Sequence, residues 1–130
     1  MIKTIDPVRY FEISRNGSGE VCQLQSVGVS PGVANNTQLI AAVSGKRIRI
    51  MGLFAQSSGA ASGSFQFKSG NAGPTLTTAI FTPPNTNGDL FMLPISDSGY
   101  WETTTGVGLF TDVTTTGQSM NIFYLVYTPT

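Results

Sequence analysis

The chain has 130 residues, and its seven Lys and Arg balance its seven Asp and Glu, so that the formal net charge is zero and only 11% of the residues are charged. Ordinary soluble domains carry about 25% charged residues, and phosphate-driven binding of nucleic acid needs an excess of basic ones, so we expect no nucleic-acid partner. With no His and a single Cys, the chain lacks the usual general base, the usual zinc ligands and any internal disulfide. We expect no metal and no other cofactor.

The first 20 residues differ in composition from the rest. Charges of both signs lie there, and none follows between residues 21 and 45. An N-terminal arm at residues 1–20 that docks on another protein, ahead of a single domain at residues 21–130, would explain this contrast, and so would a merely solvated chain end. Arg and aromatic residues dominate protein interfaces. The candidate anchors of a docking arm are therefore Arg9, Tyr10, Phe11 and Arg15.

From residue 21 onward the sequence predicts short β-strands. In the stretch 46–50 isoleucines alternate with arginines, and in 64–68 phenylalanines alternate with polar residues. Gly52 interrupts an apolar stretch and indicates a bulge or bend. The other expected strands lie at residues 21–26, 37–43, 75–81, 89–95, 107–113 and 120–128.

Clusters of Gly, Pro, Asn and Ser separate these strands, at residues 57–59, 69–74, 83–88 and 97–99. Short strands with a turn signal about every ten residues are typical of β-sandwiches and barrels. The segment 10–13 suits either a first helical turn or an extended strand. Apolar runs reach only six residues, too few to span a membrane, so we expect no membrane partner. The sequence predicts an all-β, antiparallel sandwich with an extended N-terminal arm.

The last expected strand is apolar on both faces. One face carries Ile122, Tyr124 and Val126, and the other carries Phe123, Leu125 and Tyr127. A half-exposed strand would be polar on one side. Either the second face is covered within the chain or it meets another subunit, and in a domain of this size we favour the subunit contact. The candidate residues of that contact are Phe123, Tyr124, Leu125 and Tyr127.

Few residues form a motif that carries chemistry. The tripeptide at 45–47 resembles the end of a phosphate loop, but Ile40 stands where that loop needs a glycine and Arg47 where it needs Ser or Thr. The acidic residues Asp97, Glu102 and Asp112 do not have the spacing of a calcium-binding loop, and scattered acids on loops are usually solvated. Cys22 lies in an alternating stretch, where a lone Cys usually fills space. We expect no enzymatic activity.

Tyr100 and Trp101 stand next to a turn glycine. Aromatic side chains in such a place could stack on a sugar ring. A lone Trp beside a turn is more often an anchor of the core or of an interface, and both interpretations stay open.

Several stretches together resemble a known family. They are 38–50 (QLIAAVSGKRIRI), 65–70 (FQFKSG), 99–104 (GYWETT) and 106–109 (GVGL). The pattern is similar to that of small virion proteins of tailed bacteriophages, of the capsid decoration (cement) or head-fibre type, and covers about residues 37–127. The resemblance implies a jelly-roll-like β-sandwich that assembles as a homotrimer on the capsid exterior, with the major capsid protein as its partner.

The expected function is that of a non-enzymatic structural virion protein, which binds the outer capsid surface and stabilises contacts between major capsid subunits. The alternative is a tail-fibre or baseplate module that binds host surface glycans, with Tyr100 and Trp101 on the sugar and Asp97 or Glu102 on its hydroxyls. A glycan hydrolase with two carboxylates is the third class, but no nucleophile and base can be paired from the sequence.

Overall fold

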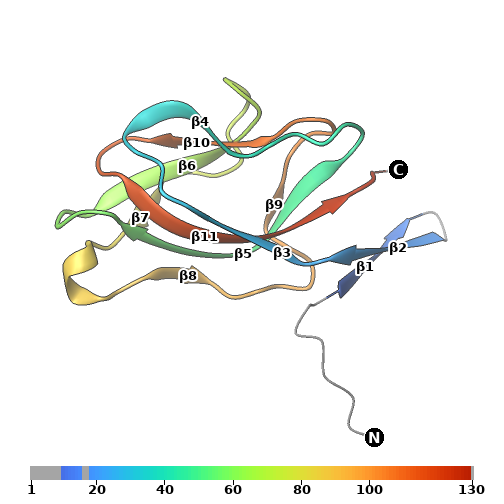
Figure 1. Cartoon of the computed structure of the whole chain (residues 1–130), viewed down its shortest axis with the longest axis horizontal. Coiled ribbons are helices and arrows are strands. Elements are labelled where there is room, and N and C mark those ends of the chain that lie inside the picture. The colour runs from blue at the N-terminus through green and yellow to red at the C-terminus, as the bar shows by residue number, and fades with distance from the viewer. Residues whose placement is uncertain (1–9, 16–17, 130) are drawn as a thin grey trace, which may run out of the picture.

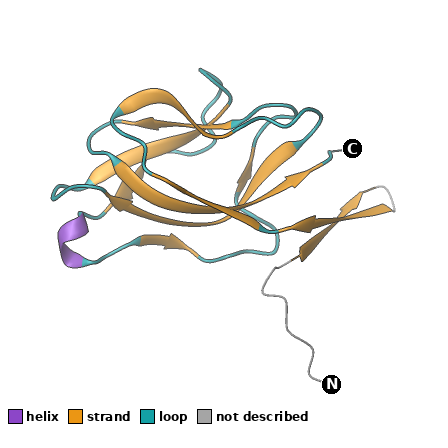
Figure 2. Cartoon of the chain, in the orientation of Figure 1, coloured by secondary structure: helices purple, strands orange, loops and turns teal. Residues whose placement is uncertain are grey.

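The structure is a computed structural model that describes residues 10–15 and 18–129. In Figure 2 the described chain consists of strands and loops with one short 3₁₀ turn, η1 (Asn85–Asn87). None of the described residues forms a helix that is long and apolar enough to cross a membrane. The expected all-β class is confirmed.

The strands of the main body pair as one long hairpin that is folded over on itself. Its outer pairs are β3 (Gln25–Val29) with β11 (Gln118–Tyr127), and β4 (Ala34–Ile40) with β10 (Leu109–Val113). Its inner pairs are β5 (Arg47–Ser57) with β8 (Phe91–Leu93) and β9 (Trp101–Glu102), and β6 (Gly63–Ser69) with β7 (Ile80–Thr82). All pairs are antiparallel, and this order of pairing is that of a jelly roll. The expected fold is therefore confirmed.

The folded hairpin forms two sheets that pack face to face. One sheet has the order β3-β11-β5-β8, with β9 also on β5, and the other has the order β4-β10-β6-β7. Figure 1 shows them as the two layers of a sandwich. Inward-facing side chains of both sheets form the main core, among them Ile50 of β5, Phe65 and Phe67 of β6, and Leu109 of β10. The two phenylalanine rings meet edge to face, with their centroids 5.1 Å apart.

A β-bulge in β5 changes which residues face the main core. The core-facing residues are Ile48 and Ile50 before the bulge, and Leu53 and Ala55 after it. The cause is visible in the register with β11, because Phe123 pairs with Gly52 while the next residue, Tyr124, pairs with Ile50. Met51 is thus the extra residue, and the side-chain alternation shifts by one position after it. The bulge expected at Gly52 is confirmed.

One expected strand, at residues 75–81, is mostly a loop. Thr75 forms a single bridge with Lys68, and β7 begins only at Ile80. The backbone N–H of Leu76 donates to the carbonyl of Phe67 at 2.8 Å, but the N–H of Phe67 donates to the hydroxyl of Thr77 at 3.2 Å. Because a side chain takes the place of the backbone acceptor, the ladder ends there.

The described part of the N-terminal segment is a hairpin. β1 (Tyr10–Arg15) and β2 (Ser18–Gln23) form a two-stranded sheet of their own, so the extended alternative for residues 10–13 is the one observed. In Figure 1 the hairpin extends beyond one end of the sandwich. Leu24 alone separates β2 from β3, and the expected strand at residues 21–26 is thus divided between two sheets. The expected boundary between residues 20 and 21 lies within β2.

Candidate functional site

Three of the four proposed capsid anchors are residues of β1. Tyr10, Phe11 and Arg15 pair with Gln23, Cys22 and Ser18, respectively. Arg9 lies outside the described residues. The docking role of the four residues stays a prediction.

The last strand, β11, is covered within the chain on one half of its outer face. Leu125 and Tyr127 are 1% and 4% exposed, although both point away from the main core. They belong to a second apolar group on the outer face of the five-stranded sheet. We call this group the outer cluster; it consists of Cys22, Leu24, Met51, Ile95, Leu125 and Tyr127.

Two segments supply the cover of the outer cluster. The end of β2 and the one-residue link after it contribute Cys22 and Leu24, and the loop that follows β8 contributes Ile95. The N–H of Ser96 donates to the carbonyl of Met51 at 2.9 Å and fixes that loop on the sheet. The expectation that Leu125 and Tyr127 contact another subunit is therefore wrong, because side chains of the same chain already bury both residues.

Phe123 and Tyr124, the other proposed subunit residues, are both partly exposed but lie on opposite faces of β11. Tyr124 packs against the main core, and burial raises the pKa of its hydroxyl. Phe123 is on the outer face, where its ring meets Phe54 edge to face with centroids 5.5 Å apart. Of the four proposed subunit residues, Phe123 therefore remains available to a partner.

Trp101 serves as an anchor of the main core. Its ring lies against Phe67, at 6.0 Å between centroids, and against Tyr100, at 5.8 Å. The hydroxyl of Tyr100 donates to the carbonyl of Pro94 and ties β9 to the preceding loop. Both side chains keep part of their surface in solvent.

Glu102, the neighbour of Trp101, holds a cluster of charged groups on the outer face of β5 and β9. Its Oε1 accepts from Arg47 Nη1 at 3.2 Å, and its Oε2 accepts from Arg49 Nη2 at 3.1 Å and from the hydroxyl of Tyr127. The Arg49 guanidinium also lies over the Tyr127 ring, 4.6 Å from its centroid. These charged groups thus cover one side of the outer cluster.

Burial alone would raise the pKa of Glu102, but the hydrogen bonds from Tyr127 and Arg49 and the charges of both arginines outweigh burial and lower it. For Tyr127, burial and the hydrogen bond to Glu102 raise the pKa. At neutral pH the carboxyl is therefore ionised and the phenol is protonated.

A shallow, open pocket of about 290 Å³ lies beside this cluster. Its lining residues are Arg49, Ser98, Gly99, Tyr100, Trp101 and Glu102. Gly99 has a φ of 76°, and a Cβ there would stand 2.7 Å from Arg49 Cδ, so only glycine lets the loop lie on the arginine. An aromatic wall beside ionised groups can hold a small polar ligand such as a sugar.

The three acidic residues considered in the sequence do not converge. Asp112 lies in the four-stranded sheet, where it pairs with Lys68 at 3.3 Å and accepts from the N–H of Asn36 at 2.7 Å. Asp97 is not among the residues that line the pocket with Glu102. Within the described residues, no group of three His, Cys, Asp or Glu side chains lies close enough to hold a metal ion.

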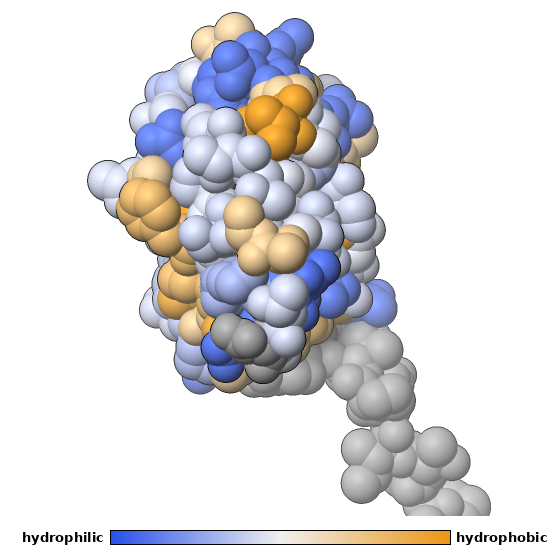
Figure 3. Space-filling view, turned by 90° about the vertical axis from the view of Figure 1, so that its left-hand side faces the viewer, coloured by the Kyte–Doolittle hydropathy of each residue, from blue (hydrophilic) through white to orange (hydrophobic). Residues whose placement is uncertain are grey.

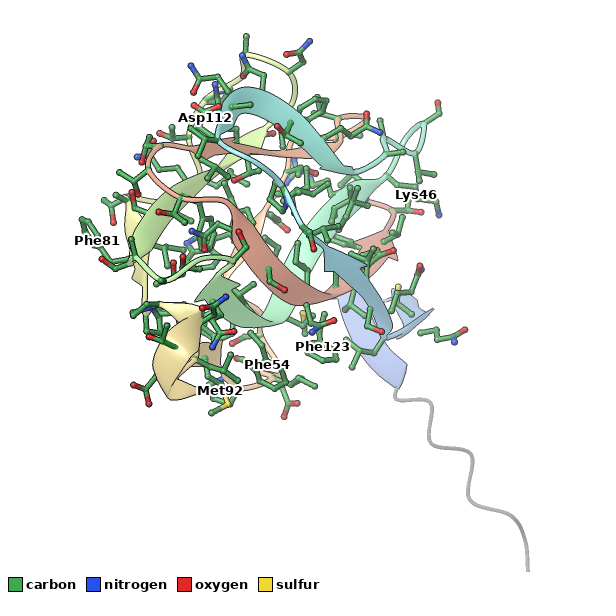
Figure 4. The ribbon with its side chains drawn as sticks, turned by 60° about the vertical axis from the view of Figure 1, so that its left-hand side comes forward. Lys46, Phe54, Phe81, Met92, Asp112 and Phe123 are labelled. Carbon is green, nitrogen blue, oxygen red and sulfur yellow. The ribbon has the colours of Figure 1, made fainter. Side chains whose placement is uncertain are left out.

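Beyond the outer cluster, the same face of the five-stranded sheet carries three apolar side chains. Phe54 of β5 pairs in register with Met92 of β8, and Phe123 of β11 lies beside Phe54. Met92 is 58% exposed, and the two rings are half-buried. Figure 4 shows Phe54, Met92 and Phe123 on one side of the molecule, away from Phe81. We call Phe54, Met92 and Phe123 the outer patch.

Sequence reasoning missed Phe54 and Met92 as surface residues. Phe54 follows directly on an apolar run, and a strand without a bulge would have placed it on the core side. The signal was Gly52, which indicated the bulge but not the direction in which it shifts the alternation.

Searches among protein families, curated proteins and solved structures find no match to this chain.

Proposed function

We propose that the protein is a non-enzymatic structural component of a tailed-bacteriophage virion, which decorates the capsid exterior. In this proposal it binds the major capsid protein through its N-terminal segment and stabilises the contacts between neighbouring capsid subunits. It acts as a homotrimer.

The observation that carries the proposal is the separation of the hairpin from the sandwich. The nine-stranded body has its own main core and its own two sheets, to which β1 and β2 add no strand. An isolated two-stranded hairpin is marginally stable in water, and a surface on which it can pack would stabilise it. A body with its own two sheets, joined to a hairpin that, among the described side chains, contributes only Cys22 to its apolar packing, suits an attachment protein whose hairpin packs on a partner.

The composition of the surface supports the same function. Gly, Thr, Ser and Asn make up 51 of the 130 residues, so that hydroxyl and amide groups rather than ions meet the solvent. On the face drawn in Figure 3, pale, weakly polar residues prevail, and strongly hydrophobic ones form separate spots. Contacts made by hydroxyl, amide and apolar groups depend little on salt concentration, which suits a protein that stays bound to a particle.

The state of the acidic residues supports a role without catalysis. Glu102 is ionised and its oxygens accept from two arginines and a tyrosine, so it is not available to donate a proton. Asp112 is paired with Lys68, with side chains only 18% and 12% exposed. Both carboxylates hold strands together.

The test is binding to capsids that lack the protein. Purified full-length chain should decorate undecorated particles, and a cryo-EM reconstruction should place it over the junctions between major capsid subunits. Removal of residues 1–20 should abolish binding but leave the body folded. As the matched control, Phe81→Thr, which changes a fully outward ring on the other sheet (75% exposed), should bind as the wild type does. Normal decoration by the truncated chain would contradict the proposal.

A second candidate function, binding of host glycans by a tail module, is favoured by the pocket beside Tyr100. Trp101 is a poor probe of it, because its ring packs on Phe67 and its removal would also loosen the core. Tyr100→Ala and Ser98→Ala change the pocket wall from the solvent side. Binding on a glycan array that is lost in Tyr100→Ala, at an unchanged melting temperature, would establish this function in place of capsid decoration.

A further inference from the structure

We propose that the outer patch is a surface on which a second copy of this chain binds. The proposal rests on the proposed function only for the expected number of copies, which is three. The surface itself is inferred from the packing, the charge and the free strand edge of the five-stranded sheet.

The outer patch spans three adjacent strands. Met92, Phe54 and Phe123 come from β8, β5 and β11, which are neighbours in the sheet. The patch begins where the outer cluster ends, because a Cβ on Gly52 would stand 3.1 Å from Cγ1 of Ile95, the last residue of that cover. The part of the chain that the structure describes therefore covers one half of this face and leaves the outer patch, on the other half, partly in solvent.

The outward strand positions around the outer patch carry no charge; in the loop before β8, the carbonyl of Asp89 accepts from Gln56 Nε2 at 2.8 Å. Along residues 26–29 of β3 and 118–122 of β11 the burial alternates, and the more exposed residues are those that point away from the core. The outward neighbours of the patch are Ser26 and Gly28 of β3, Gln56 of β5, and Ser119 and Asn121 of β11.

This absence of charge favours a second copy as the partner. Close to a symmetry axis each side chain meets its own counterpart, so that a charged residue there would face a like charge at close range. Hydroxyl, amide and apolar groups meet their own counterparts without repulsion. A strongly charged partner of either sign, in contrast, would find no group of opposite charge among these neighbours.

The strand edge beside the patch points to the same partner. Among the described strands β3 pairs only with β11, so the other edge of β3 has free backbone donors and acceptors. Natural edge strands are usually protected by Lys, Pro or a bulge, and the sequence of β3, QSVGV, has neither Lys nor Pro. Since Ser26 of β3 pairs with Phe123, a copy that covers the patch also reaches this edge.

The experiment measures the molar mass of the full-length chain by light scattering over a range of concentrations. The wild type should be an oligomer at micromolar concentration. Phe54→Thr and Phe123→Thr should each weaken association by about 30-fold or more, as truncation of an interface hot spot does. Phe81→Thr is the matched control, because it removes a more exposed ring from the other sheet. It should associate as the wild type does.

A second measurement on the wild type does not depend on how a variant folds. Met92 is exposed in the single chain, whereas Met120 is 2% exposed in the core. If a second copy covers the patch, hydrogen peroxide should oxidise both methionines slowly at high protein concentration. On dilution below the dissociation constant, the oxidation rate of Met92 should rise, whereas that of Met120 should stay low.

The outcomes separate the two proposals. A wild-type monomer at micromolar concentration, or an oligomer in which Met92 is oxidised as fast as in the diluted chain, would overturn the inference. A dimer with a protected Met92 would uphold the surface and refute the trimer of the proposed function. An oligomer that assembles through the patch but does not bind capsids would likewise uphold the surface and refute capsid decoration.

Discussion

The junction between hairpin and sandwich allows a sharp test by two truncations that differ by four residues. Removal of residues 1–20 deletes β1 and half of β2 but keeps Cys22 and Leu24. Removal of residues 1–24 also deletes these two side chains, which cover Met51, Leu125 and Tyr127 in the outer cluster. We expect the shorter truncation to leave the stability of the body nearly unchanged and the longer one to lower it.

The size of the effect follows from what the longer truncation uncovers. Cys22 is 6% exposed and Leu24 is half-buried. Full burial of one Leu-sized side chain stabilises a fold by about 1.5–3 kcal/mol. The loss of one buried and one half-buried side chain should therefore lower the free energy of unfolding by about 2–4 kcal/mol. For a chain of this length 1 kcal/mol corresponds to roughly 4 °C, and the melting temperature should fall by about 8–16 °C.

The assay is thermal unfolding of the full-length chain and both truncations, followed by circular dichroism. Equal melting temperatures for the full-length and the shorter chain, with a clear drop for the longer truncation, are expected. If removal of residues 1–20 already causes the full drop, the hairpin is part of the body. If removal of residues 1–24 causes none, the outer cluster does not stabilise the sheet.

Three further predictions concern single residues. Glu102→Gln should lower the urea midpoint at pH 7 modestly, because the carboxylate is about one-third exposed, and the difference from wild type should vanish in acid. Since folding lowers the pKa of Glu102, its contribution is complete above the ordinary Glu value of about 4.3 and is lost as the pH falls through the lowered one; a difference that stays constant from neutral pH down to the acid unfolding of the protein would contradict this. Tyr124→Asp should abolish folding as judged by circular dichroism, whereas Phe123→Asp should yield a folded monomer, because only Tyr124 packs on the main core; a folded, assembled Tyr124→Asp would be contrary evidence. Reducing agent should change neither assembly nor melting temperature, since Cys22 is buried; a reducible cross-link between chains on a non-reducing gel would disprove it.

The fold class was predictable from the sequence because its signals are local. Alternation in the stretches 46–50 and 64–68 and the turn clusters between strands determine where β-strands form, and the observed strands follow them. The exception at residues 75–81 shows the limit of such signals. Their Thr-rich pattern fits a strand, but a hydroxyl of Thr77 replaces a backbone acceptor, and this competition depends on where Phe67 lies in the fold.

The cover of the last strand could not be predicted, because it depends on segments distant in sequence. The apolar outer residues of β11 indicated a contact but not its partner. In the structure two contacts share this face: Leu125 and Tyr127 meet Cys22 and Met51 of the same chain, and Phe123 stays open to solvent. A two-sided apolar strand is therefore evidence for a cover, and the sequence alone does not tell an internal cover from a subunit.

The single extra residue in β5 explains how both contacts arise on one strand pair. Up to Met51, the outward positions of β5 are those that the arginines and the outer cluster occupy. After the bulge the alternation shifts, so that Leu53 enters the main core and Phe54 turns outward beside Phe123. If Met51 instead paired as a regular strand residue, the shift would disappear, and Phe54 would point into the core in place of Leu53. The bulge thus keeps the core continuous along β5 and at the same time creates the outer patch, which places the internal contact and the proposed intermolecular one side by side on the same sheet.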